Sequence, residues 1–194
     1  MTREEVQLFL DHADAQVETA LRRGHKGALA SYRDATVFKV VYAWGLRCSE
    51  ASGLDIADFH RRADAPELGR FGALDVGPSG LPPRWRTVVS TMPWAVEAVE
   101  DYVDHIRPRY RSSRQPALWP TERGGRLSAR GIRERFASYR DALGLDKAMT
   151  PHRMRGAYIA HLLEGGADLA FVRQQVGRTV AATIAARVRP ARPQ

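Results

Sequence analysis

Residues 150–178 read TPHRMRGAYIAHLLEGGADLAFVRQQVGR, and this stretch decides the fold. Thr150 is a good helix N-cap, and Pro151 suits the first helical position because its missing N–H has no helical partner there. His152 and Arg155 are three residues apart and share one helical face. An imidazole and a guanidinium beside a helix N-terminus suit a phosphate ligand. Gly165 and the residues after it end the helix and start another.

A second motif lies about a hundred residues earlier, where residues 42–54 read YAWGLRCSEASGL. Gly45 is a natural helix C-cap, Arg47 follows on a corner, and Ser49 with Glu50 indicates the start of the next helix. Taken alone, this pattern favours a solvated Arg47 at a helix–turn–helix corner over a functional site.

Together the two motifs resemble the tyrosine recombinases, or phage integrases. The resemblance covers the chain from its first helix to about residue 187 and implies a mainly α (α+β) catalytic domain with a small antiparallel β-sheet. It also implies that Arg47, His152 and Arg155 converge in one cleft and bind the scissile phosphate.

The same resemblance points to positions where this chain departs from the family pattern. Arg178 stands at the usual position of a second His, and Arg187 at the usual position of the nucleophilic Tyr. The family carries a catalytic Lys in its β-hairpin, but no Lys lies between Lys39 and Lys147. An arginine is a poor proton donor to a leaving oxygen because its pKa is above 12. The resemblance therefore implies a degenerate active site.

The rest of the chain indicates helices at about 2–21, 30–44, 93–107, 128–143 and 179–188. Two β-rich runs at 71–76 and 84–89 predict a hairpin within 70–91. We expect one catalytic domain over 1–188 and a basic tail at 189–194, without the DNA-binding domain that precedes this domain in the family.

The charge balance favours a nucleic acid partner. The chain has 30 Lys and Arg against 22 Asp and Glu, which gives a net charge of +8, and almost all the positive charge is guanidinium. We expect weak, salt-sensitive binding of duplex DNA, largely independent of sequence. The arginines expected to contact DNA are Arg84, Arg86, Arg126, Arg130, Arg153 and Arg173.

The sequence gives little support for a membrane span or a metal site. No apolar run approaches the roughly 18 residues that a membrane span needs, so we expect a cytoplasmic protein. His152 and His161 are nine residues apart and do not form a helical metal pair, so neither a metal nor another cofactor is expected.

Three functional hypotheses stay open. The chain is a decayed recombinase left by a mobile element, a DNA-binding accessory factor or regulator on the recombinase fold, or a subunit that receives Tyr in trans from another recombinase subunit. The sequence does not rank the first two, because both a frameshift and selection can produce the tail after Val176. The third is the weaker option.

Overall fold

The computed structural model describes residues 1–24, 27–63, 65–77, 85–111 and 115–177. Within these ranges the chain is mainly helical with a small antiparallel sheet, as the sequence predicted. The helices are α1 (Arg3–Arg22), α2 (Ala28–Ala43), α3 (Cys48–Gly53), α4 (Pro93–Asp101), α5 (Ala129–Ala142), α6 (Pro151–Glu164) and α7 (Leu169–Val176). The helix expected at 179–188 lies outside the described residues.

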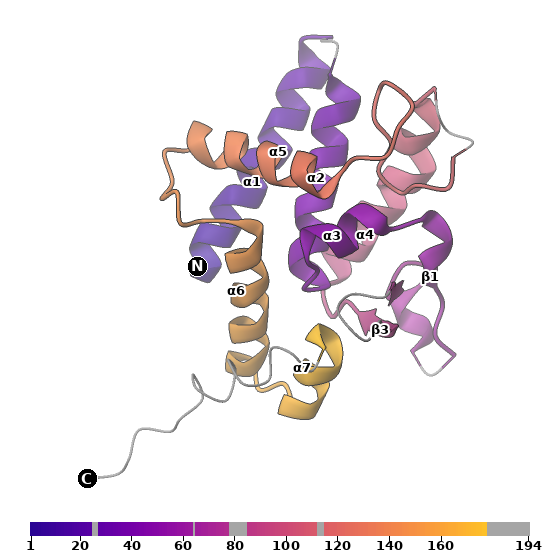
Figure 1. The fold of residues 1–194 in the computed structure, drawn as a ribbon, viewed down its shortest axis with the longest axis vertical. Coiled ribbons are helices and arrows are strands. Elements are labelled where there is room, and N and C mark those ends of the chain that lie inside the picture. The colour runs from indigo at the N-terminus through magenta and orange to yellow at the C-terminus, as the bar shows by residue number, and fades with distance from the viewer. Residues whose placement is uncertain (25–26, 64, 78–84, 112–114, 178–194) are drawn as a thin grey trace.

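Helix α2 is the centre of the helical layer (Figure 1). It packs against α1, α4, α5 and α6, and for this reason it is buried around most of its circumference rather than along one stripe. Aromatic side chains join it to its neighbours: the ring centroids of Phe9 and Phe136 lie 4.3 Å apart, and Phe38 contacts both edge-on.

Local sequence explains most helix ends. The Thr2 hydroxyl accepts the backbone N–H of Glu5 while the Glu5 carboxylate accepts that of Thr2, which caps α1. Thr150 caps α6 by accepting the N–H of Arg153. The N-cap expected at Ser49 is wrong, because the N-cap of α3 is Arg47, two residues earlier. The Glu50 carboxylate accepts the Arg47 backbone N–H at 2.8 Å and fixes that position.

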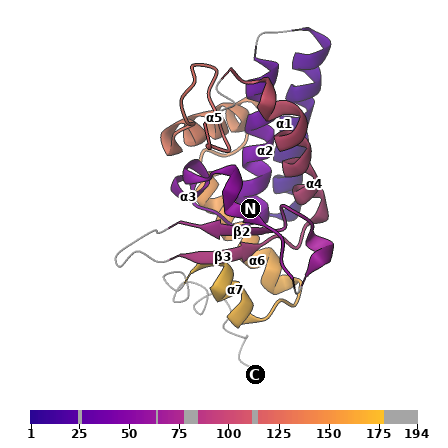
Figure 2. The ribbon, with the colours of Figure 1, turned by 90° about the vertical axis from the view of Figure 1, so that its right-hand side faces the viewer.

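The sheet has three strands in the order β1-β2-β3: β1 (Phe59–His60), β2 (Ala73–Val76) and β3 (Arg86–Val89). The predicted hairpin is β2 and β3, with Leu74 opposite Val88. The sheet extends further than the expected 70–91, since β1 adds Phe59 opposite Leu74. Figure 2 shows α7 beside β3, so the sheet lies next to the C-terminal helices.

Candidate functional site: an arginine cluster around Glu50

Three arginines from distant parts of the chain meet at one buried carboxylate, that of Glu50 on α3. Arg47 Nη1 lies 2.7 Å from Glu50 Oε1. Arg86 on β3 donates to both carboxylate oxygens, each at 2.8 Å. Arg155 on α6 donates to Oε2 at 3.2 Å. The structure thus brings Arg47 and Arg155 together and adds Glu50 and Arg86 to them.

Backbone carbonyls complete the cluster. Arg155 donates to the carbonyls of Gly45 and Val176, and Arg86 Nε donates to that of Gln175 at 2.9 Å. The side chain of Arg155 is 2% exposed, and that of Arg86 is 12% exposed. Their orientations are therefore fixed by the fold, whereas Arg47, with 33% of its side chain exposed, lies at the outer edge.

The cluster carries more positive than negative charge. Burial alone would raise the pKa of Glu50, but the hydrogen bonds and charge of Arg86, the Arg47 backbone N–H and the charge of Arg155 lower it to about 2. Burial lowers the pKa of Arg155 to about 10, and Arg47 and Arg86 add to that effect. Both groups are ionised at neutral pH, so three guanidiniums surround one carboxylate.

The corner before Arg47 is shaped by close packing. Gly45 has φ +59°, a left-handed conformation that favours glycine. A Cβ at this position would lie 2.4 Å from the ring of Tyr158, which is completely buried on α6. The pair Gly45–Tyr158 therefore lets α6 approach the corner closely enough for Arg155 to reach the Gly45 carbonyl.

The predicted phosphate ligand His152 lies in the first turn of α6 and is exposed, in contrast to the buried Arg155 one turn later. Arg153 is exposed beside it. Both exposed residues belong to the first turn of the helix that carries Arg155, but no contact joins either side chain to Glu50, Arg47 or Arg86 among the described residues. The predicted site residues Arg84, Arg178 and Arg187 lie outside the described residues.

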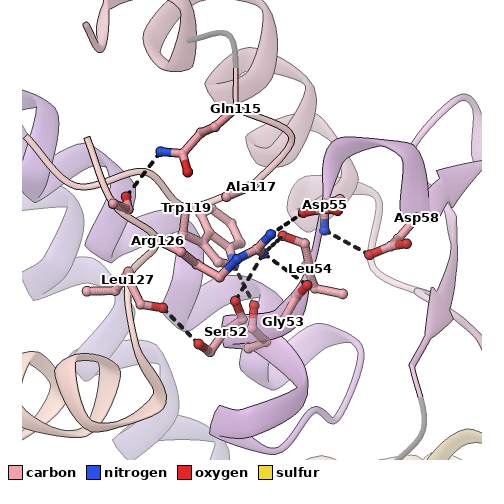
Figure 3. Close-up of polar contacts among 12 residues, drawn as sticks. Ser52, Gly53, Leu54, Asp55, Asp58, Gln115, Ala117, Trp119, Arg126 and Leu127 are labelled. Carbon is pink, nitrogen blue, oxygen red and sulfur yellow. Dashed lines mark hydrogen bonds and ion pairs between the residues drawn. The ribbon is translucent and has the colours of Figure 1, made fainter. Parts of the chain in front are cut away.

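The arginines predicted to contact DNA differ in their surroundings. Arg126 holds the C-terminal end of α3, where it donates to the carbonyls of Ser52, Gly53 and Leu54 and pairs with Asp55 (Figure 3). Arg130 lies on the surface of α5, with 82% of its side chain exposed and Glu134 at 2.7 Å. Arg173 is exposed on α7. Arg130, Arg153 and Arg173 therefore face solvent, whereas Arg86 and Arg126 are bonded within the protein.

Two residues of the cluster, Glu50 and Arg86, were not predicted from the sequence as partners of Arg47 and Arg155. Glu50 was interpreted only as a first-turn helix residue, and Arg86 only as a DNA contact. Glu50 is buried, and an ionised carboxylate is seldom buried without cations. The available signal was a Glu three residues after Arg47 in a segment otherwise rich in apolar and small residues.

The described part of the chain contains neither a candidate metal site nor a candidate membrane span. No group of three or more His, Cys, Asp or Glu side chains there is arranged to hold a metal ion. Among the helices in the described ranges, none is both long and apolar enough to cross a membrane.

Comparison with known proteins identifies relatives of the chain. The chain is 32% identical over 151 residues to tyrosine recombinase XerD of Corynebacterium glutamicum, a match that covers 78% of this chain and 46% of that protein. It is 35% identical over 151 residues to tyrosine recombinase XerC of Pelotomaculum thermopropionicum, covering 75% and 45%. The chain thus spans about half the length of these relatives.

A solved structure shares the fold: XerH site-specific recombinase bound to its difH substrate has a TM-score of 0.74 at 18% identity, over 99% of this chain and 50% of that one. The sequence pattern of the phage integrase family matches residues 1–186. That match takes in all seven helices and the sheet of the described residues. The chain belongs to the phage integrase family, and its relatives named above are tyrosine recombinases.

Proposed function

We propose that this chain is a recombinase catalytic domain, related to DNA integration and site-specific recombination, that binds duplex DNA but does not cleave it alone. The observation that carries the proposal is the arginine cluster around Glu50. Three guanidiniums against one carboxylate leave an excess of positive charge, and the fold fixes its position. A DNA phosphate is the ligand that fits this charge and donor geometry.

Exposed polar side chains support a phosphate position at the edge of the cluster. Arg47 presents a third of its side chain at the edge of the cluster, and His152 and Arg153 are exposed at the start of α6. A helix N-terminus also favours an anion. In this arrangement Arg155 acts mainly through its charge and its hold on Glu50, while Arg47 and His152 contact the phosphate. The DNA-bound XerH relative, which shares the fold, supports DNA as the partner.

The absence of cleavage follows from the chemistry that strand transfer needs. The reaction requires a nucleophile and an acid for the leaving 5′-oxygen. Position 187 holds Arg instead of the expected Tyr, and no Lys lies between Lys39 and Lys147. Arg cannot replace Tyr as a nucleophile because it stays protonated. The loss of a covalent nucleophile costs several powers of ten in rate.

Tyr158 is a poor substitute nucleophile. Its side chain is 0% exposed, and its hydroxyl has no hydrogen-bond partner among the described residues. Burial raises its pKa far above the usual value. A buried, protonated phenol does not reach a phosphate at the exposed edge of the cluster.

A second candidate function is favoured by the intact cluster. Arg47 and Arg155 lie together at Glu50, and this arrangement supports a site that a Tyr from another recombinase subunit would complete in trans. This candidate predicts cleavage only in mixtures with a Tyr-bearing recombinase. The first candidate predicts none in such mixtures.

A binding titration tests the DNA proposal. Anisotropy of a labelled duplex of about 25 base pairs is measured at 50 and 200 mM salt. If Arg47 and Arg153 neutralise about two phosphates, affinity falls about 12-fold over this range. Arg47→Gln should weaken binding at low salt. Arg22→Gln is the matched control, since Arg22 is 74% exposed on α1 and, among the residues that the structure describes, pairs with Glu18 of the same helix.

Two results would overturn the proposal. One is an affinity that does not change between the two salt concentrations, because counterion release would then be missing. The other is equal weakening by Arg47→Gln and Arg22→Gln, which would show general surface charge rather than a site at the cluster.

A further inference from the structure

The most exposed large apolar side chain among the described residues is Trp85, at 68%. Trp44 and Trp119 are completely buried, and the other partly exposed indole, Trp94, is 41% exposed on α4. Trp85 directly precedes β3, and because it is largely exposed it contributes little to the core. A single exposed apolar residue is ordinary, and its meaning depends on what surrounds it.

Trp85 forms one wall of a pocket of about 280 Å³. Its ring lies over Gly77, where a Cβ would be 3.7 Å from the indole. Leu54 supplies an apolar surface, and the acidic residues of the lining are Asp58 and Asp55, whose carboxylate also pairs with Arg126. The Asp58 carboxylate accepts the backbone N–H of Asp55 at 2.8 Å (Figure 3) and, as a carboxylate, can accept further hydrogen bonds.

The pocket adjoins the arginine cluster. Glu50 belongs to both, since it lines the pocket and binds the three arginines. Arg86, the residue after Trp85, donates to both oxygens of Glu50. A nucleotide whose phosphate lies at the cluster therefore has a flat aromatic surface and a small acceptor-lined pocket next to it.

We propose that this pocket accepts an unpaired nucleobase, stacked on Trp85, from a DNA strand whose backbone lies at the arginine cluster. The inference rests on the DNA binding proposed above. Carboxylates exclude the phosphate from the pocket, so the base rather than the backbone enters it. The excess of positive charge at the adjoining cluster disfavours a cationic side chain as the ligand.

The chemistry also predicts which bases are preferred. Stacking on an indole suits every base. The acceptors at Asp55 and Asp58 favour a base with an exocyclic amino group, which cytosine and adenine carry and thymine lacks. The pocket should therefore prefer unpaired cytosine or adenine over unpaired thymine.

The test compares three duplexes of equal length: one fully paired, one with a single unpaired cytosine and one with a single unpaired thymine. We expect about tenfold tighter binding of the unpaired-cytosine duplex than of the paired duplex, with thymine between them. Trp85→Ala should lower the affinity for the unpaired-cytosine duplex to that of the paired duplex. Trp94→Ala, a matched exposed indole outside the pocket, should keep the preference.

Tryptophan fluorescence reports the stacking directly. Quenching by the unpaired-cytosine duplex should disappear in Trp85→Phe and persist in Trp94→Phe. Equal affinity for all three duplexes, or a preference that survives Trp85→Ala, would overturn the inference and leave duplex binding intact. Binding of none of the duplexes would refute the proposed function itself. Quenching of Trp85 by an oligo-arginine peptide but not by DNA would show a cation pocket instead.

Discussion

Glu50 Oε2 lies 3.2 Å from Arg155 Nη1, although 105 residues separate them in the sequence. Both side chains are 2% exposed, so this ion pair ties α3 to α6 inside the protein. A buried pair contributes little when intact relative to apolar residues, but removing one partner leaves the other charge buried and unpaired. The stability of the cluster therefore depends on Glu50.

Replacement of Glu50 should be strongly destabilising. Glu50→Ala leaves Arg155 and Arg86 without their carboxylate and is expected to cost about 3–5 kcal/mol in free energy of unfolding. Urea unfolding at pH 7 measures this. Glu134→Ala, which removes an exposed pair with Arg130, should cost under about 0.5 kcal/mol. Similar losses for both variants would show that the buried ion pairs of Glu50 contribute no more to stability than the exposed pair of Glu134.

The same carboxylate predicts a pH dependence. The pKa of Glu50 is about 2 in the folded protein, below its value of about 4.5 in an unfolded chain. A carboxyl with a lowered folded pKa stabilises fully above the unfolded pKa and loses that contribution as the pH falls to the folded pKa. The free energy of unfolding should therefore decrease between about pH 4.5 and pH 2.

Glu50→Gln separates this effect from the other carboxylates. The stability difference between the parent chain and Glu50→Gln should be constant from pH 7 to about pH 5 and shrink below pH 4.5 by up to about 3 kcal/mol. Chemical unfolding at intervals of half a pH unit gives the curve. A difference that stays constant down to pH 3 would mean that the Glu50 pKa is not depressed in this way.

Gly45 should be intolerant of any side chain. Gly45→Ala places a Cβ at positive φ and 2.4 Å from the buried Tyr158 ring, so we expect a loss of about 2–4 kcal/mol in free energy of unfolding. Gly53→Ala is the control, because Gly53 is exposed and nothing lies within 4 Å of its Cβ position. Thermal unfolding of both variants measures the difference in stability. An unchanged stability of Gly45→Ala would argue against the close approach of α6 to Gly45.

Local signals predicted most of the fold. Thr150 caps α6 at its expected position, and the helices expected at about 2–21 and 128–143 are α1 and α5. Strand β1 was missed because two residues are too few to show an alternating pattern. Ser49 was expected to be the N-cap because its hydroxyl suits that position. The Glu50 carboxylate instead accepts the Arg47 N–H, so the helix starts nearer the N-terminus, at Cys48.

The site was less predictable because its defining contacts join distant residues. The motifs identified Arg47 and Arg155 separately, but neither motif shows that Glu50 lies between them. Arg86 is the first residue of β3, and the sequence of so short a strand does not tell which of its faces is buried. Only the packing of β3 on α3 and α7 decides that Arg86 points inward.

Arg126 and Arg130 should separate stability from DNA binding. Arg126→Ala removes the donor to three carbonyls at the end of α3 and should cost about 1–2 kcal/mol in free energy of unfolding. Arg130→Ala should leave stability within about 0.5 kcal/mol. If Arg130 contacts a phosphate, its loss should reduce the salt slope of DNA binding by about one. An unchanged slope in Arg130→Ala would place that part of α5 outside the DNA interface.

The central claim is that the chain binds DNA at the arginine cluster without cutting it. The most direct measurement incubates the unmodified chain with a nicked suicide duplex, then runs the sample on a native and a denaturing gel. We predict a shifted complex on the native gel, weakened in Arg47→Gln, and no protein–DNA adduct on the denaturing gel. A covalent adduct that disappears in Arg155→Ala would contradict the account and identify a nucleophile in this chain.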